Sequence, residues 1–220
     1  MLKKTTLLTI FSISYMFILR TLGTLYPQLF TRNILLNQCT GFFALLASLF
    51  LVLFFSFFLK EYVSPEHSVL RTATILALTG SIARLVIYLK NISFQSAAKL
   101  YSVELAILWL NSVFITIFFI AFYREHKRGL PALRRASFLA ILGSLCILLL
   151  YSFTLINYHL YLQGSTSFEA FMYKLILVSF PVVVFNFVTL LYFFVVYYRH
   201  LKVQGYWFPE NNDINDGKFL

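Results

Sequence analysis

The stretch CTGFFALLASLFLVLFFSFFL, residues 39–59, contains no charged side chain. A helix needs about 20 apolar residues to cross a hydrocarbon core about 30 Å thick, so this stretch is long enough to span a membrane. A second stretch, ASFLAILGSLCILLLYSFTLINY at residues 136–158, is also free of charge. Uncharged runs of this length predict transmembrane helices rather than the core of a soluble domain.

The composition extends that prediction to the whole chain. Of the 220 residues, 60% are hydrophobic and 12% are charged, against about 25% charged residues in soluble domains. We predict an all-α integral membrane protein: a six-transmembrane-helix bundle over residues 1–202, followed by a short polar tail, 203–220. The predicted spans are 5–25, 39–59, 69–89, 102–123, 136–158 and 172–198.

The first span resembles a signal peptide, because Lys3 and Lys4 precede its apolar residues. Ser12, Ser14 and Arg20 interrupt it, however, and no small-residue cleavage pattern follows. We therefore interpret this segment as a span that the mature chain retains.

The distribution of basic residues predicts the orientation of the bundle. The net charge is +10, and Lys60, Arg71 and the segment 124–135 bring much of it to one side. The loops on the other side contain only Arg32, Lys90 and Lys99. Since cytoplasmic loops carry the excess of Lys and Arg, we expect both termini in the cytoplasm and a multi-pass protein of the plasma (inner) membrane. The basic charge then indicates contact with the lipid bilayer, and we expect no nucleic-acid partner.

Similar segments recur along the chain. Residues 70–88, LRTATILALTGSIARLVIY, match residues 133–151, LRRASFLAILGSLCILLLY, at nine positions, which include a Gly-Ser pair and the final Tyr. Residues 111–127, NSVFITIFFIAFYREHK, resemble residues 186–202, NFVTLLYFFVVYYRHLK, and the second span ends similarly in FFSFFLKE.

These similarities have two interpretations. In the first, an outward and an inward helix form a unit that is used three times, with a degenerate first copy. In the second, the similarity is convergent, because every inward helix needs aromatic residues and a basic stop at the interface. In either case Gly80-Ser81 and Gly143-Ser144 predict close helix contacts, since small residues let two backbones approach in lipid.

The chain contains few residues suited to catalysis. His67, His126 and His200 fall in predicted cytoplasmic segments, His159 stands alone near the outer edge, and no Asp precedes residue 213. No histidine, cysteine or carboxylate motif has the spacing of a metal site. We expect no catalytic residues, no metal and no cofactor. Cys39 and Cys146 should lie at different depths, too far apart for a disulfide.

Arg84 and Glu104 are the best candidates for a polar site within the membrane. Both lie ten residues from position 94, the centre of the predicted loop between the third and fourth spans. An antiparallel hairpin would place them at equal depth, so we predict that they form an ion pair. The pair would act as a structural clamp or, less simply, as part of a ligand site.

Arg20 and Lys174 should lie at a similar outer depth. Snorkelling toward the headgroups accounts for Lys174, whereas Arg20 stays open between snorkelling and an inward orientation. If both turn inward, Arg20, Arg84, Glu104 and Lys174 would form a ligand-binding mouth of net positive charge that attracts an anion or a carboxylate. Asn111 and Asn186 should lie beyond the midplane, where we expect structural hydrogen bonds between helices.

Three classes of function remain. The first is a non-enzymatic sensory or partner-binding membrane module with a small outer-facing polar pocket. It would bind a small-molecule ligand and act through a protein partner or as a homo-oligomer. The second is a transporter or channel component for a small, anionic solute, and the third is the membrane subunit of an enzyme complex. Few Gly and Pro residues argue against the broken helices of many transporters.

Overall fold

The computed structural model describes residues 1–26, 34–63, 67–93, 98–126, 131–165 and 167–207. These residues form six α-helices, and each predicted span lies inside one of them. The helices are α1 (Leu2–Leu25), α3 (Ile34–Glu61), α4 (Ser68–Ser93), α5 (Ala98–Glu125), α6 (Pro131–Leu162) and α7 (Phe168–Trp207). All six are long and apolar enough to cross a membrane, which confirms the prediction of an all-helical chain with six helices able to span a membrane.

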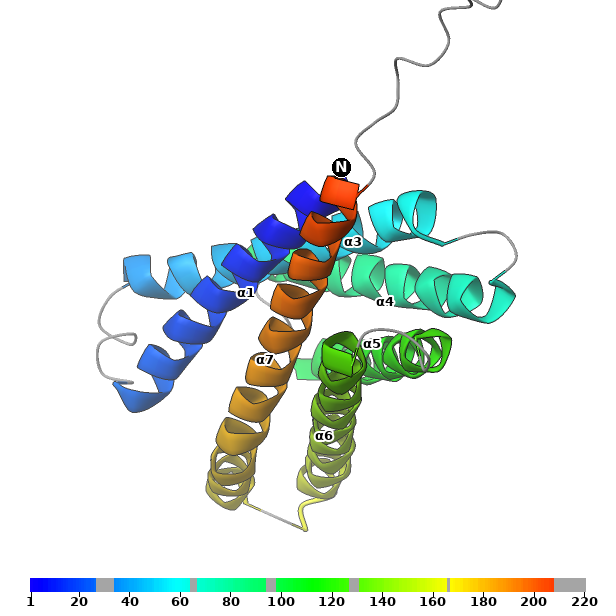
Figure 1. The fold of residues 1–220 in the computed structure, drawn as a ribbon. Coiled ribbons are helices and arrows are strands. Elements are labelled where there is room, and N and C mark those ends of the chain that lie inside the picture. Colours follow the sequence, from blue (N-terminus) through cyan, green and yellow to red (C-terminus); the bar gives the residue numbers. More distant parts are fainter. Residues whose placement is uncertain (27–33, 64–66, 94–97, 127–130, 166, 208–220) are drawn as a thin grey trace, which may run out of the picture.

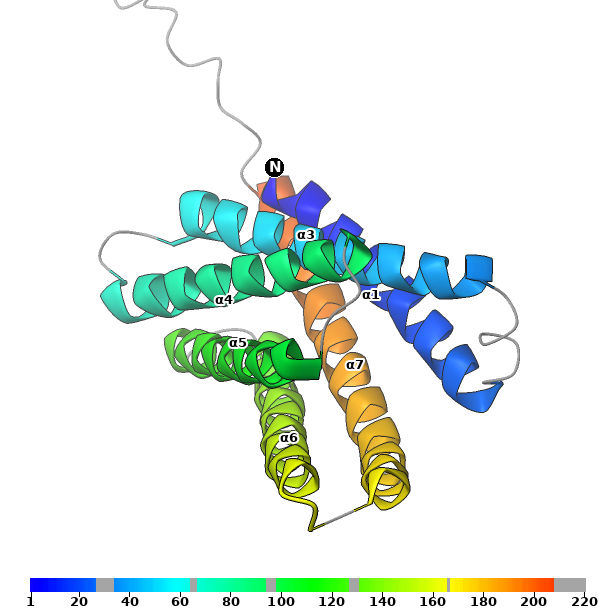
Figure 2. The same ribbon diagram turned by 180° about the vertical axis from the view of Figure 1, so that it is seen from behind.

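The six helices form a closed ring. Each helix packs against the next one along the chain, and α7 packs against α1 to close the circle. Figures 1 and 2 show this order from opposite sides, with the first turn of α1 beside the last turns of α7. In chain order the helices can be grouped into three consecutive pairs: α1 with α3, α4 with α5, and α6 with α7.

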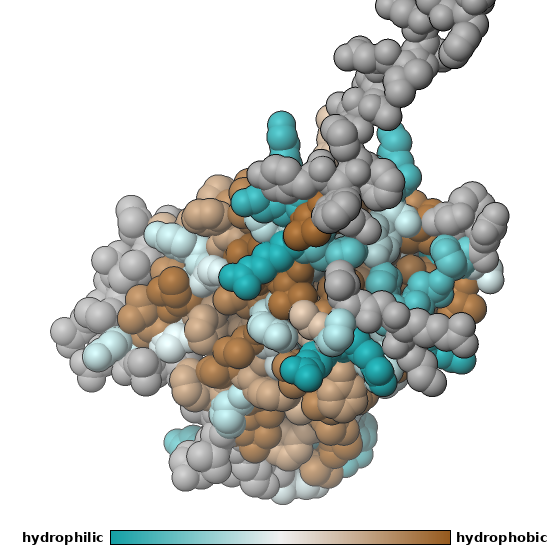
Figure 3. Space-filling view, in the orientation of Figure 1, coloured by the Kyte–Doolittle hydropathy of each residue, from teal (hydrophilic) through white to brown (hydrophobic). Residues whose placement is uncertain are grey.

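The outside of the ring is apolar. Phe11, Leu149 and Ile156 expose 67%, 69% and 62% of their surface, and hydrophobic side chains cover much of the face shown in Figure 3. A soluble protein rarely leaves apolar patches of this extent on its surface. The exposed hydrophobic side chains are thus suited to contact with lipid tails.

Both ends of the helix ring have a distinct make-up. We call the end where α1 begins and α7 ends the terminal face, and the opposite end the loop face. At the terminal face the Met1 amino group forms an ion pair with Glu61 (3.1 Å), and the same carboxylate accepts the Leu2 backbone N–H (2.9 Å). His67, just before α4, contacts the Glu125 carboxylate of α5. These contacts join α1 to α3 and α4 to α5 at the end of the ring that the sequence predicts to be cytoplasmic.

Three aromatic triplets fill the axis of the ring near the terminal face. Each follows the pattern Phe-Phe-x-x-aromatic, and all nine side chains are at most 2% exposed. The triplets are Phe54, Phe55 and Phe58 in α3; Phe118, Phe119 and Phe122 in α5; and Phe193, Phe194 and Tyr197 in α7. An i, i+1, i+4 spacing places the three side chains on one side of a helix, so each triplet faces the axis.

The triplets interlock with a threefold pattern. The second Phe of each triplet meets the first Phe of the next one edge to face, with ring centroids 5.0, 4.9 and 5.0 Å apart; these pairs are Phe55–Phe118, Phe119–Phe193 and Phe194–Phe54. The third members form a triangle with sides of 6.0, 5.9 and 6.0 Å, made by Phe58, Phe122 and Tyr197. Such edge-to-face pairs contribute about 0.5–1.5 kcal/mol each beyond burial. We call these nine side chains the aromatic plug.

The first helix of each pair also repeats a local arrangement near the terminal face. A hydroxyl donates a hydrogen bond to the carbonyl oxygen of a buried leucine four residues earlier, at 2.8, 2.7 and 2.7 Å; the pairs are Thr6–Leu2, Thr74–Leu70 and Ser137–Leu133. Small residues around these positions let each of these helices approach its neighbours closely. The pair of α1 and α3 thus shares the buried aromatic triplet and the leucine–hydroxyl contact with the other two pairs, although its sequence is the least similar.

Both predicted glycine contacts are present. A Cβ atom on Gly80 would lie 2.7 Å from the side-chain oxygen and 3.1 Å from the Cα of Asn111. A Cβ atom on Gly143 would lie 3.2 Å from the Cα of Asn186 and would overlap the Thr189 hydroxyl. Glycine is needed at both positions because the neighbouring helix comes too close for any side chain. The two asparagines that the sequence aligned with each other therefore meet the two aligned glycines.

Candidate functional site

A cavity of about 480 Å³ lies on the axis of the ring, between the aromatic plug and the loop face. All six helices contribute to its wall. Its floor toward the terminal face contains Phe55, Phe119 and Phe194, the second member of each aromatic triplet. Toward the loop face the wall reaches Thr21 and Leu175. This volume is sufficient for a small organic molecule.

Three helices line the cavity in the same way. Every fourth residue of α3, α5 and α7 faces it, ending at the floor; the three series are Ala47, Leu51, Phe55, then Asn111, Ile115, Phe119, and then Asn186, Leu190, Phe194. Residues four apart lie on one helix face, which explains the series. The wall is thus apolar near the floor, and one turn further from the floor than Ile115 and Leu190 it carries the carboxamides of Asn111 and Asn186.

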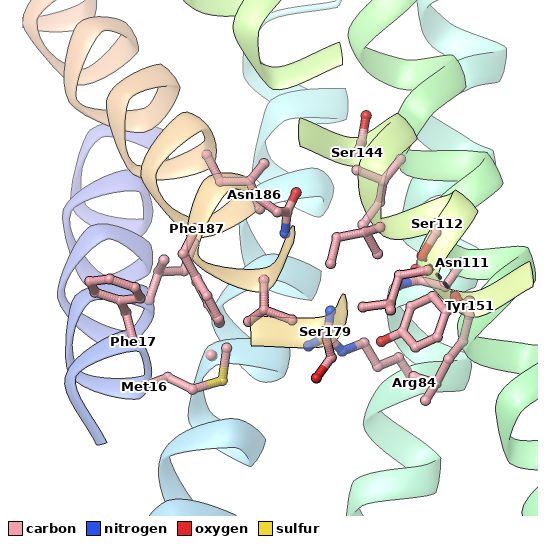
Figure 4. A pocket seen from close by; sticks show the side chains of 18 of the residues that line it. Met16, Phe17, Arg84, Asn111, Ser112, Ser144, Tyr151, Ser179, Asn186 and Phe187 are labelled. Carbon is pink, nitrogen blue, oxygen red and sulfur yellow. Dashed lines mark hydrogen bonds between the residues drawn. The ribbon is translucent and has the colours of Figure 1, made fainter. Parts of the chain in front are cut away.

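Arg84 is the one charged residue among the described residues that line the cavity. Its guanidinium donates a weak hydrogen bond to the Tyr88 hydroxyl (3.4 Å) and lies 5.4 Å from the centre of that ring. Its Nε is shielded from solvent and makes no hydrogen bond to a described residue. Figure 4 shows Arg84 reaching from α4 into the space between Tyr151 of α6 and Ser179 of α7. No carboxylate of the described residues forms an ion pair with it.

The predicted ion pair of Arg84 with Glu104 is not formed. Glu104 is buried and pairs with Lys90 (Nζ to Oε1, 3.5 Å), whereas Arg84 lies deeper in the ring. The prediction placed the loop centre at residue 94, but α4 runs to Ser93 and α5 begins only at Ala98. The centre therefore lies between residues 95 and 96, which puts Arg84 about one helical turn, or ~5 Å, below Glu104. Glu104 does not line the cavity.

The remaining predicted site residues have different outcomes. The side chains of Arg20 and Lys174 lie outside the described part of the structure, so their role stays a prediction. Asn111 and Asn186 both line the cavity. The side-chain oxygen of Asn111 is buried and accepts no hydrogen bond from a described residue. The predicted inter-helix hydrogen bond of this oxygen is therefore absent, because Gly80 rather than a donor packs against it.

Several polar residues of the wall escaped the sequence analysis. Hydroxyl groups of Tyr88, Tyr151, Ser179 and Thr154 border the cavity around Arg84. Tyr88 and Tyr151 are the last matching residues of the two similar segments, and that match was a usable signal. The serines and threonines carried no such signal, since these residues occur throughout transmembrane helices as donors to their own backbone.

A polar layer covers the aromatic plug at the terminal face. The Tyr62 hydroxyl and His126 Nε2 are 2.6 Å apart, and the His126 Nδ1–H donates to the Phe122 carbonyl oxygen (2.8 Å). Nε2 is therefore the acceptor, and the Tyr62 hydroxyl donates to it. Burial lowers the pKa of His126 below its usual range, and burial raises the pKa of Tyr62 to about 12. Both groups are thus neutral at pH 7.

No three His, Cys, Asp or Glu side chains lie together as metal ligands within the described ranges. Cys39 and Cys146 are free thiols. The chain matches no protein-family model, and no curated protein or solved structure matches it. A functional conclusion therefore depends on the cavity itself.

Proposed function

We propose that this protein is a non-enzymatic membrane module that binds a small carboxylate-bearing solute in the central cavity. The position of Arg84 carries the proposal. Its guanidinium lies in the cavity wall, and its described contact is to a neutral tyrosine rather than to a carboxylate. An arginine inside a transmembrane helix is costly, up to about 2.5–3.5 kcal/mol at the helix centre on insertion scales, so such residues pair with something or serve a function.

The chemistry around Arg84 favours a carboxylate as the counter-charge. A guanidinium binds a carboxylate through two parallel hydrogen bonds, and the Nε that such a bond uses is unoccupied in the described structure. Tyr151 and Ser179 border the same part of the cavity, so the surroundings of the guanidinium are polar. The rest of the wall is largely aliphatic and aromatic, which suits an apolar body on the solute.

A thermal-shift experiment on the purified protein tests this proposal. The probes are benzoate and hexanoate, with benzamide and hexylamine as neutral and cationic counterparts. A ligand that binds the folded state raises the melting temperature in proportion to ln(1 + [L]/Kd), so we expect stabilisation by the two acids alone. Arg84→Gln should abolish the effect and Arg84→Lys should weaken it.

Arg134→Gln is the matched control. Arg134 is an exposed arginine near the start of α6 that donates to the Tyr123 hydroxyl and does not line the cavity. Its loss should leave the response to benzoate unchanged. Equal stabilisation by benzamide, or an undiminished response in Arg84→Gln, would contradict the proposal.

A sensor and a transporter would both bind the solute, but only a transporter would move it across the membrane. We favour a sensory or partner-binding role, in which the basic terminal face contacts a protein partner or a second copy of the chain. Transport of the same solute is the second candidate, because all six helices surround the cavity as they would a path along the axis. Flux of labelled benzoate into proteoliposomes that contain this chain alone would favour transport, and a co-purifying protein in native mass spectrometry would favour sensing.

We also propose that the terminal face is cytoplasmic and that the three helix pairs arose by repetition of one ancestral pair. The excess of Lys and Arg around the terminal face supports the orientation. The threefold interlock of the triplets and the matched leucine–hydroxyl contacts support the repetition. Labelling of Ser68→Cys from only one side of the membrane tests the orientation directly.

A further inference from the structure

We propose that the aromatic plug is a gate between the central cavity and the terminal face, closed by a hydrogen bond from Tyr62 to His126 and opposed by the hydroxyl of Tyr197. The inference goes beyond solute binding, since it gives the cavity a regulated exit. It rests on the proposed function only in treating the cavity as a ligand compartment.

The position of the plug is the first argument. The second members of the triplets line the cavity as its floor, and the third members lie one helical turn closer to the terminal face. One further turn brings the chain to Tyr62 and His126, beyond the ends of the membrane-spanning segments. The barrier between the cavity and the terminal face therefore consists of these aromatic layers, which three separate helix pairs supply.

The hydrogen bond across the top is the second argument. Tyr62 follows α3 and His126 follows α5, and their rings stack on Phe58 (4.8 Å) and Phe122 (4.1 Å) of the triangle below. The 2.6 Å bond between them thus ties two of the three triplets together where they reach the surface. Separation of the triplets requires this bond to break, so it acts as a latch.

The third argument is the residue that breaks the threefold pattern. The triangle contains phenylalanine at positions 58 and 122 but tyrosine at 197, and the Tyr197 hydroxyl is buried without a hydrogen-bond partner among the described residues. A buried, unsatisfied hydroxyl destabilises the packed state by roughly 1–3 kcal/mol. Water entering an opened plug would satisfy it. This hydroxyl consequently favours the open state. A purely structural core would be more stable with phenylalanine at position 197.

The test measures access to the cavity from the terminal face. In a background of Cys39→Ser and Cys146→Ala, the reporter is Ser112→Cys, since Ser112 lines the cavity and is 6% exposed. The probe is the membrane-impermeant anion 2-sulfonatoethyl methanethiosulfonate, applied to inside-out and to right-side-out vesicles. Ser68→Cys, exposed at the terminal face, shows which vesicles present that face and serves as the reference for full access.

Three Tyr→Phe variants should have three different effects on the labelling rate: a rise, a fall and no change. Tyr62→Phe removes the latch, and a hydrogen bond of about 1 kcal/mol corresponds to a rise of about fivefold. Tyr197→Phe removes the unsatisfied hydroxyl and should slow labelling by about tenfold. Tyr123→Phe, on the same helix as the plug, removes only a surface contact to Arg134 and should have no effect.

The outcomes separate a gate from a permanent core. Reporter labelling that never occurs from the terminal face, even in Tyr62→Phe, would overturn the proposal. So would equal acceleration by all three variants, because that result indicates general loosening. The gate is read from the labelling rates of the Tyr62 and Tyr197 variants, whereas solute binding is read from the benzoate-dependent thermal shift, so a failure of the solute-binding proposal is distinguishable from a failure of the gate.

Discussion

Replacement of Phe122 by alanine probes the threefold packing most directly. The Phe122 side chain is 0% exposed, and its ring lies 6.0 Å from Phe58, 5.3 Å from Phe193 and 5.9 Å from Tyr197, all on other helices. In a membrane the unfolded reference is also apolar, so the substitution loses packing rather than a transfer free energy from water. Three aromatic contacts at about 0.5–1.5 kcal/mol each give a loss of about 3 kcal/mol in the free energy of unfolding.

The assay is reversible unfolding in mixed detergent micelles with increasing dodecyl sulfate. Because the triangle is nearly equilateral, Phe58→Ala should cost about the same as Phe122→Ala. The double variant should cost about 1 kcal/mol less than the sum of the two single variants, since the contact between the rings is lost only once.

Phe11→Ala is the matched control, because this phenylalanine is 67% exposed on the outside of the ring. Its loss should cost less than about 0.5 kcal/mol. A cost for Phe122→Ala below about 1 kcal/mol, or additive costs in the Phe58–Phe122 pair, would refute the reasoning that the triplets pack as one cooperative unit.

Three further predictions concern the glycines, the ion pair and the latch. Gly80→Ala should destabilise the protein by about 1–3 kcal/mol because its Cβ would lie 2.7 Å from the Asn111 oxygen, whereas Gly41→Ala, with nothing within 4 Å, should be neutral in the same unfolding assay. Exchange of charges in Lys90→Glu with Glu104→Lys should recover part of the melting temperature lost in either single variant, and exchange in Arg84→Glu with Glu104→Arg should not, because the structure pairs Glu104 with Lys90. Burial lowers the pKa of His126 in the folded protein, so on acidification the unfolded chain binds a proton at this residue before the folded one does. The melting temperature should therefore fall as the pH drops from about 6.5 through the lowered pKa. His126→Gln should flatten that fall. An unchanged slope in His126→Gln would assign the effect to other groups.

The sequence was sufficient to predict the helices but not their side-chain contacts. Uncharged runs such as residues 39–59 indicate the spans, because they have the length of a membrane-crossing helix, which satisfies all of its own backbone hydrogen bonds in lipid. The glycine contacts were predictable for a similar reason, since small residues mark close approach. The Arg84–Glu104 pair failed because a difference of one or two residues in the loop centre shifts one helix against the other by a large part of a turn.

The aromatic plug shows what further information was needed. The Phe-rich inner ends of α3, α5 and α7 were visible as similar segments, yet similar segments on separate helices do not reveal that they meet. Their convergence depends on the closure of the ring by α1 and α7, a contact between the two ends of the chain. The polar wall around Arg84 depends on the same closure, because its residues come from different helix pairs.

The threefold frame also has a consequence for how a molecule would sit within it. Three identical walls would offer any guest three equivalent poses, a degeneracy of RT ln 3, or about 0.6 kcal/mol. A single chain can vary each wall separately, and here position 84 is arginine where the matching residue of α6 is Ile147, while Ala47 stands where the other two walls have asparagine. Among the described residues, one cation on one wall removes the degeneracy and leaves an unsymmetrical compartment inside a threefold shell. An assembly of three identical two-helix subunits could reproduce the shell but never that asymmetry.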